Sequence, residues 1–155
     1  MDKSEILKFF KNENLPNTYA NLCKKFNDFE YLKSPKKEDL LEIVSSNGLK
    51  LKYSKSENLL YEETSGKVCD FRFLVSFKDG ILSSTYMSLE DNDSDKENLF
   101  GYELRHIIEE LEPKLMNSLE YPYPLSTSNG DLEEILNFYL NLYKRFKKKF
   151  LNQDP

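Results

Sequence analysis

The alternating stretch at residues 68–77, VCDFRFLVSF, constrains the fold more than any other part of this sequence. Side chains of a strand point alternately to the two faces of a sheet, so apolar residues at every second position predict a strand with one apolar face. Asp79-Gly80 follows directly, and this dipeptide favours a two-residue hairpin turn. Residues 81–90 are therefore expected to return as the next antiparallel strand. The apolar positions of the first strand are Cys69, Phe71, Phe73, Val75 and Phe77.

Two shorter segments before this hairpin are also predicted to be strands. Residues 49–53, LKLKY, alternate between apolar and polar side chains, and residues 58–64, NLLYEET, end at the turn Ser65-Gly66. Consecutive strands joined by short turns form an antiparallel meander, so we expect about four strands with one apolar face.

Apolar residues at helical spacing precede the meander. They occur in residues 4–10, 18–29 and 34–48, which predicts three helices. In the third helix, Ser34 is the expected N-cap and Asn47-Gly48 is the expected stop.

Two more helices are expected after the meander. In the first, Leu104, Ile107 and Ile108 begin an apolar stripe, which Pro113 should kink or end. The second starts near Ser128 and has the most regular amphipathic pattern of the chain. Its stripe contains Leu132, Ile135, Leu136, Tyr139, Leu142, Tyr143, Phe146 and Phe150.

Together these segments predict one α+β domain over residues 1–155, with N-terminal helices, the antiparallel meander, and two C-terminal helices packed on one face of the sheet. Such a chain is long enough to bury a core without disulfides, and Cys23 and Cys69 are expected to be buried reduced thiols. No stretch approaches the roughly 20 apolar residues that span a bilayer, and the charged start MDKSEILKFF is unlike a secretory signal. We therefore expect a soluble, cytoplasmic protein. The excess of lysine over arginine favours a bacterial source.

One acidic loop resembles part of a calcium-binding EF-hand, because acids occupy alternate positions: Asp91, Asp93 and Asp95. An EF-hand loop also needs glycine at its sixth position and glutamate at its twelfth, where this chain has Lys96 and Tyr102. We therefore expect no metal here. Ser94 and Glu97 have the spacing of a helix capping box, which predicts that a helix starts at this point.

The sequence contains no signature of a cofactor. It has no nucleotide-binding glycine motif, and its five glycines leave little loop material for cradling phosphates. His106 is the single histidine, so a site with two imidazoles is excluded. A small enzyme that uses His106 as a general base is the remaining catalytic alternative. We expect no cofactor and no enzymatic activity.

The C-terminal segment YKRFKKKF, residues 143–150, raises a second alternative, a nucleic-acid-associated regulator. The aromatic residues of this segment, however, belong to the apolar stripe. Its cations lie at a helix C-terminus, where positive charge suits the helix dipole. We therefore expect exposed surface cations and no binding of nucleic acid.

Negative charge is concentrated in the middle of the chain, where residues 51–130 contain 8 basic and 15 acidic side chains. Such a surface repels nucleic acid and attracts a basic protein. We therefore predict a non-enzymatic protein-binding module, a small bacterial neutraliser (immunity-like or antitoxin-like) that occludes a basic partner such as a toxin or nuclease. The sequence does not indicate the oligomeric state. The predicted partner-binding residues are Tyr86, Glu90, Asp91, Asp93, Asp95, Glu97, Tyr102, Glu103, Glu109 and Glu110, and Tyr121 and Tyr123 are further candidate anchors.

Overall fold

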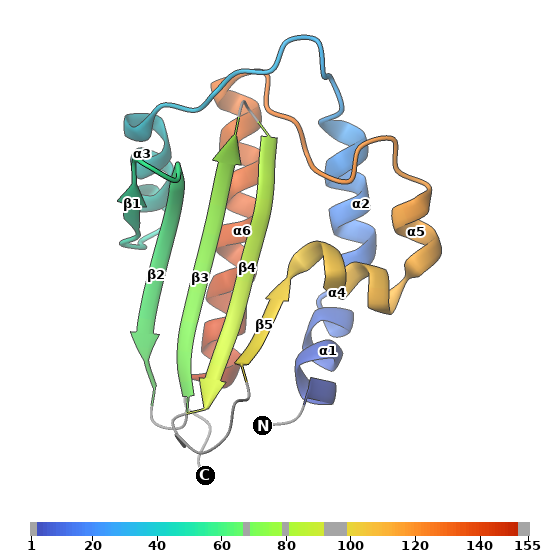
Figure 1. Cartoon of the computed structure of the whole chain (residues 1–155), viewed down its shortest axis with the longest axis vertical. Coiled ribbons are helices and arrows are strands. Elements are labelled where there is room, and N and C mark those ends of the chain that lie inside the picture. Colours follow the sequence, from blue (N-terminus) through green and yellow to red (C-terminus); the bar gives the residue numbers. More distant parts are fainter. Residues whose placement is uncertain (1–2, 67–68, 79–80, 92–98, 152–155) are drawn as a thin grey trace.

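The computed structural model of this protein describes residues 3–66, 69–78, 81–91 and 99–151. Its strands form one antiparallel sheet in which neighbours along the chain are also neighbours in space (Figure 1). The strands are β1 (Lys52–Ser54), β2 (Leu59–Ser65), β3 (Cys69–Lys78), β4 (Ile81–Asp91) and β5 (Leu99–Glu103). The helices are α1 (Lys3–Asn12), α2 (Leu15–Lys25), α3 (Lys37–Ser46), α4 (Leu104–Leu111), α5 (Pro113–Asn117) and α6 (Asn129–Phe150).

The hairpin at the centre of the sheet forms as the alternating sequence predicts. β3 and β4 pair as far as Lys78↔Ile81, so two residues connect them. The α+β class and the antiparallel meander are confirmed. The inward-facing residues of β3 are at most 2% exposed, whereas the residues between them are half-buried. These buried residues are Phe71, Phe73, Val75 and Phe77.

The edge of the sheet next to α4 differs from the prediction. A fifth strand, β5, pairs with Tyr86–Glu90 of β4, whereas the sequence predicts about four strands. The predicted capping box does not start α4, because α4 begins at Leu104 with Glu103 as its N-cap. Ser94 and Glu97 themselves lie outside the described residues. The backbone groups of β5, residues 99–103, are instead satisfied by pairing with β4. A prediction from local helix signals does not include such pairing between strands.

The predicted helix boundaries agree with the structure at Pro113 and Gly48 and differ from it at the start of α3. Pro113 ends α4 and opens α5, so a third, short helix lies between the two that were expected. Gly48 (φ +71°) follows the last turn of α3, as predicted. The prediction that Ser34 caps α3 is wrong, because the N-cap of this helix is Lys36. The backbone N–H of Lys33 donates to the carbonyl of Ser126 (3.0 Å), which lies in the connector, residues 118–128 between α5 and α6. Local capping signals do not include such a contact between distant segments.

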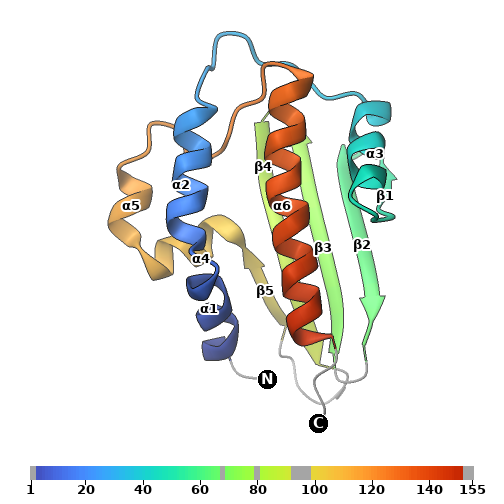
Figure 2. The ribbon, with the colours of Figure 1, turned by 180° about the vertical axis from the view of Figure 1, so that it is seen from behind.

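α6 is the central helix. Figure 2 shows it lying across one face of the sheet, with α3 on one side and α1 and α2 on the other. Its N-cap is as predicted, because the Ser128 hydroxyl accepts a hydrogen bond from the backbone N–H of Asp131 (3.1 Å). The whole predicted stripe is buried. Leu140, which lies outside that stripe, is buried as well, because other elements cover α6 on several sides.

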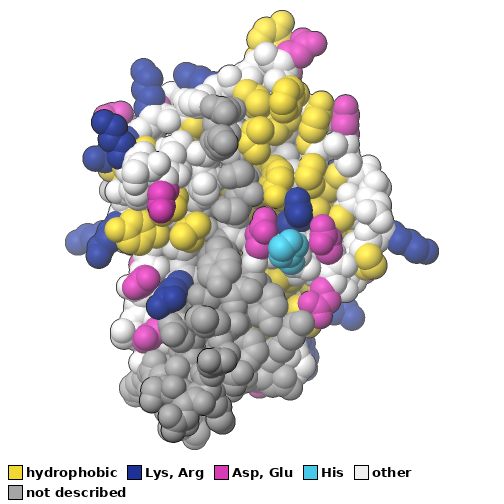
Figure 3. Space-filling model, viewed as in Figure 1, with side chains coloured by type: hydrophobic (Ala, Val, Ile, Leu, Met, Phe, Trp, Pro, Cys, Tyr) yellow, Lys and Arg dark blue, Asp and Glu magenta, His cyan; other side chains and the backbone are white. Residues whose placement is uncertain are grey.

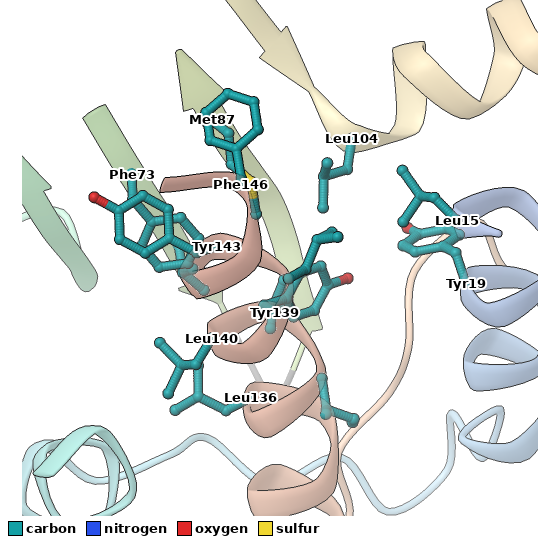
Figure 4. Close-up of a cluster of buried hydrophobic side chains, with 14 of the residues drawn as sticks. Leu15, Tyr19, Phe73, Met87, Leu104, Leu136, Tyr139, Leu140, Tyr143 and Phe146 are labelled. Carbon is teal, nitrogen blue, oxygen red and sulfur yellow. The ribbon is translucent and has the colours of Figure 1, made fainter. Parts of the chain in front are cut away.

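Aromatic rings join α6 to the sheet and to α1. Tyr143 stacks on Phe73 with ring centroids 4.4 Å apart, and Phe146 stacks on Phe10 at 5.6 Å. Figure 4 shows Tyr139 pointing away from these pairs, toward α2 and the start of α4. Rings of this size bury large apolar areas, so α6 carries much of the core.

The second face of the sheet is turned to the viewer in Figure 1, and none of the described helices crosses it. Tyr61 of β2 and Leu74 of β3, which are register partners, are half-buried.

The structure describes no helix that combines the length and the apolar character needed to cross a bilayer.

Candidate functional site

The structure brings part of the predicted acidic surface together. Glu103 lies at the start of α4, and Glu109 and Glu110 are exposed on that helix. Four other predicted residues have their backbones in β4 and β5, but their side chains lie outside the described part: Tyr86, Glu90, Asp91 and Tyr102. Three fall wholly outside the described residues: Asp93, Asp95 and Glu97.

A network of charged and aromatic groups surrounds the start of α4. Arg105 Nη1 donates to the Tyr123 hydroxyl (2.9 Å), and its guanidinium lies 5.5 Å from the centre of the Tyr123 ring. That hydroxyl donates in turn to Glu103 Oε1 (3.5 Å), and Arg105 Nε lies 3.6 Å from Glu109 Oε1. Burial, and then the neighbouring Glu103 carboxylate, raise the pKa of Tyr123. The phenol therefore stays protonated and links α4 to the connector before α6.

Two exposed aromatic residues lie in the loop between α2 and α3. Phe29 is 54% exposed and Tyr31 is 70% exposed. The Phe29 ring stacks on Tyr121, with centroids 5.6 Å apart and an interplanar angle of 17°. Tyr121 and Tyr123 are separated by one residue, so the same connector reaches both the exposed aromatic pair and the network at α4.

Hydrogen bonds hold this loop at both ends. The carbonyl of Phe26 accepts from the backbone N–H of Leu125 (2.8 Å). The backbone N–H of Lys33 donates to the carbonyl of Ser126 (3.0 Å). The aromatic residues between these points are therefore presented on a tethered segment, which lowers the entropy lost when a partner binds.

The sequence prediction missed this loop because it continued the second helix as far as residue 29. α2 ends at Lys25, and Asp28 then forms a turn in which its Oδ1 accepts from the backbone N–H of Glu30 (3.0 Å). Asn and Asp are favoured in such turns, so Asn27-Asp28 was the available signal. A helix that ends before this dipeptide would have left Phe29 in a loop.

These groups form what we call the aromatic–acidic surface. Figure 3 shows apolar side chains extending from the upper part of this face down to the histidine, which has acidic and basic side chains around it. The surface lies on the same side of the molecule as the uncovered face of the sheet. Its described residues are Phe29, Tyr31, Glu103, Arg105, His106, Glu109, Glu110, Tyr121 and Tyr123.

His106 lies on this surface and is not enclosed. Its side chain is 59% exposed, and Nε2 lies 3.7 Å from Glu103 Oε2. A small cavity of about 10 Å³ lies next to it, lined by Glu103, Leu104 and Arg105 but not by His106. This volume suits one water molecule and no substrate.

Three of the five cations in the C-terminal segment have separate partners. Arg145 Nε lies 2.6 Å from Glu13 Oε2, Lys147 Nζ lies 2.6 Å from Glu62 Oε1, and Lys144 bonds to the C-cap residue of α3. The expectation that these cations are all exposed is wrong for two of them: Lys144 is half-buried, and the Lys147 side chain is only 22% exposed. It extends from α6 to β2, a pairing that spacing within α6 does not reveal. The prediction that the aromatic residues of the segment are buried is confirmed: Tyr143, Phe146 and Phe150.

Hydroxyl groups and one thiol are buried beneath the connector and α4. Tyr19 donates its hydroxyl to a connector carbonyl (2.5 Å). Burial raises the pKa values of Tyr19 and Tyr139 and raises that of the Cys23 thiol to about 12. Thr85 is 4% exposed, and its hydroxyl has no hydrogen-bond partner among the described residues. The predicted burial is confirmed for Cys23, whereas the side chain of Cys69 lies outside the described part.

Within the described residues, no three His, Cys, Asp or Glu side chains are grouped so that they could hold a metal ion. Comparison with protein-family models gave no match, and neither did comparison with curated proteins or with solved structures. Function is therefore inferred from the geometry and charge of the surface.

Proposed function

We propose that this protein is a non-enzymatic protein-binding module of the cytoplasm, which docks a basic protein on its aromatic–acidic surface. The observation that carries this proposal is the exposure of Phe29 and Tyr31. Aromatic residues are enriched in the binding hot spots of protein interfaces, where burial of a large ring contributes much of the affinity. Both residues lie on a tethered loop beside a charged network, as anchors in an interface do.

The charges around the aromatic residues favour a basic partner. The surface carries three carboxylates at the start of α4 and along it, those of Glu103, Glu109 and Glu110, and one guanidinium, that of Arg105, which pairs with Glu109. Further exposed acids flank the aromatic end of the surface: Asp28, Glu30 and Glu120. In this proposal the carboxylates accelerate the encounter, while the aromatic anchors slow dissociation.

A small acidic module of this kind suits neutralisation of a toxin. Occlusion of a basic active-site cleft, such as that of a nuclease, requires complementary shape and charge and no catalytic group. The protein would then act as a bacterial immunity-like or antitoxin-like partner.

The experiment compares three immobilised forms of the protein in a lysate of the source organism. The first is the unmodified chain, and the second carries Phe29→Ser and Tyr31→Ser. The third is a control that carries Glu38→Lys and Glu42→Lys, two exposed positions on α3. We expect a basic protein that the unmodified and control forms retain and the aromatic variant loses. With that protein purified, the aromatic variant should bind about thirty-fold more weakly, as expected for loss of hot-spot residues.

Charge reversal tests the acidic part of the same surface. Glu109→Lys with Glu110→Lys should slow association about tenfold at low salt. The effect should diminish at high salt, since the Debye length falls from about 10 Å at 0.1 M to about 3 Å at 1 M. His106→Ala should leave binding unchanged. Equal loss of binding in the α3 control, or retention of no basic protein, would contradict the proposal.

A further inference from the structure

A cleft of about 780 Å³ lies between α1 and the C-terminal turns of α6. Figure 2 shows these two helices side by side at one end of the molecule. The volume is within the range of roughly 300–1,000 Å³ that is usual for small-molecule sites. The cleft is separate from the aromatic–acidic surface and shares no residue with it.

The apolar part of the cleft includes two rings of the core, of which Phe9 is 8% exposed and Phe150 is 1% exposed. Phe9 and Phe150 both line it and contact each other edge to face, with centroids 5.7 Å apart. Phe146 packs behind both rings, at 5.6 Å from Phe9 and 5.1 Å from Phe150. Their positions are therefore set before any ligand arrives.

Cations line both walls of the cleft. Arg145 is neutralised by Glu13 (2.6 Å), and Glu5 is the other acid in the lining. Four cations and two carboxylates give the lining a net charge of +2. Three exposed lysines have no ion-pair partner among the described residues: Lys8, Lys148 and Lys149.

The helix dipole does not account for this arrangement. Lys148 and Lys149 lie in the last turn of α6, where positive charge is favourable. Lys8, however, lies in the middle of α1 and reaches the same cleft from the opposite wall. The dipole also gives no reason for an aromatic base between the two walls.

We infer that this cleft binds a small organic anion whose acidic group contacts the lysines and whose apolar part packs on the accessible edge of Phe9, behind which Phe150 lies. A nucleic acid would require a row of cations along its backbone. On α6, Lys144, Arg145 and Lys147 already have protein partners. The other two cations of its C-terminal turns, Lys148 and Lys149, both line this cleft and do not form a row along the helix. A compact ligand that joins a sulfonate, carboxylate or phosphate to an aromatic or aliphatic group matches that arrangement.

The experiment uses 8-anilinonaphthalene-1-sulfonate as the probe, titrated into the folded protein and followed by fluorescence and calorimetry. We expect saturable binding at one site. Lys148→Gln with Lys149→Gln should weaken it about tenfold, as should Lys8→Gln on the other wall, since each change removes a charged hydrogen-bond donor. The control carries Lys24→Gln and Lys36→Gln, two exposed lysines elsewhere, and should bind as the unmodified protein does. All variants should retain the unmodified melting temperature.

Two comparisons separate the ligand classes. N-Phenyl-1-naphthylamine lacks the sulfonate, and inorganic phosphate lacks the rings, so each should bind much more weakly than the probe. The inference would be overturned by probe binding that is non-saturable or equally weakened in the control variant. It would also be overturned if phosphate alone, or a single-stranded oligonucleotide, bound as tightly as the probe.

Discussion

Replacement of Lys147 by methionine should destabilise this protein although Lys147 belongs to a run of surface lysines. Its ammonium lies 2.6 Å from Glu62 Oε1 and 3.2 Å from Thr64 Oγ1, and the Thr64 hydroxyl donates to the same carboxylate oxygen. The second oxygen, Glu62 Oε2, is buried without a hydrogen-bond partner among the described residues. Lys147→Met would therefore leave Glu62 with one hydroxyl donor and no counter-charge.

The exposure of the two side chains sets the size of the effect. Breaking a fully buried pair costs about 3–5 kcal/mol, whereas an exposed pair contributes about 0–1 kcal/mol. The side chains of Lys147 and Glu62 are 22% and 15% exposed, which is closer to the buried case but retains some contact with water. We expect a loss of about 2 kcal/mol in the free energy of unfolding, which corresponds to roughly 4–8 °C in melting temperature for a domain of this size.

Urea unfolding followed by far-ultraviolet circular dichroism measures this loss, with Lys148→Met as the matched control. Lys148 is exposed, so its substitution should change stability by less than about 0.5 kcal/mol. The double variant Glu62→Gln with Lys147→Met should lose less than the sum of the two single variants, because no buried charge remains without its partner. Equal stability of the Lys147 and Lys148 variants, or additive losses in the double variant, would refute this reasoning.

Three further predictions concern the core. Burial raises the pKa values of Cys23, Tyr19 and Tyr139, so above the unfolded values of about 8.5 for cysteine and about 10 for tyrosine the unfolded chain loses protons that the folded chain keeps. The free energy of unfolding, measured in urea at each pH, should thus be undiminished by these groups below about pH 8 and fall as the pH rises above it. Leu136→Ala should cost about 2–5 kcal/mol in the same assay, because Leu136 is 0% exposed; a loss below about 1 kcal/mol would contradict its central position. Thr85→Val should leave the melting temperature unchanged or raise it, since it removes a buried hydroxyl without a partner, and a fall would instead indicate a water molecule bound in the adjacent cavity.

Much of the fold could be predicted because the spacing of hydrophobic residues along the sequence indicates which face of a helix or strand is buried. The stripe of α6 and the alternation of β3 are both strong patterns, and the structure buries each of them. β5 was not predicted because its pattern is short and its stability comes from pairing with β4, which is a contact between elements.

The candidate site was predictable in its charge and not in its aromatic part. Glu103, Glu109 and Glu110 lie close together in the sequence, so their grouping on α4 follows from local structure. The contact between Phe29 and Tyr121 joins segments that are about ninety residues apart. The spacing of hydrophobic residues within one segment does not indicate which distant segment it contacts. The pairing of Lys147 with Glu62 is invisible in the sequence for the same reason.

The position of α6 in the chain has a consequence during synthesis on the ribosome. The strands β1 to β5 all emerge before α6, yet α6 is the element that covers the apolar face of their sheet. α1 and α3 are made first, but they pack beside α6 and do not replace it on the sheet. The nascent sheet therefore exposes the rings of β3 until α6 is complete, and such surfaces are prone to aggregation. The protein gains its stable form only after α6 has emerged, and a chaperone that shields an apolar sheet face would act in the interval between the strands and α6.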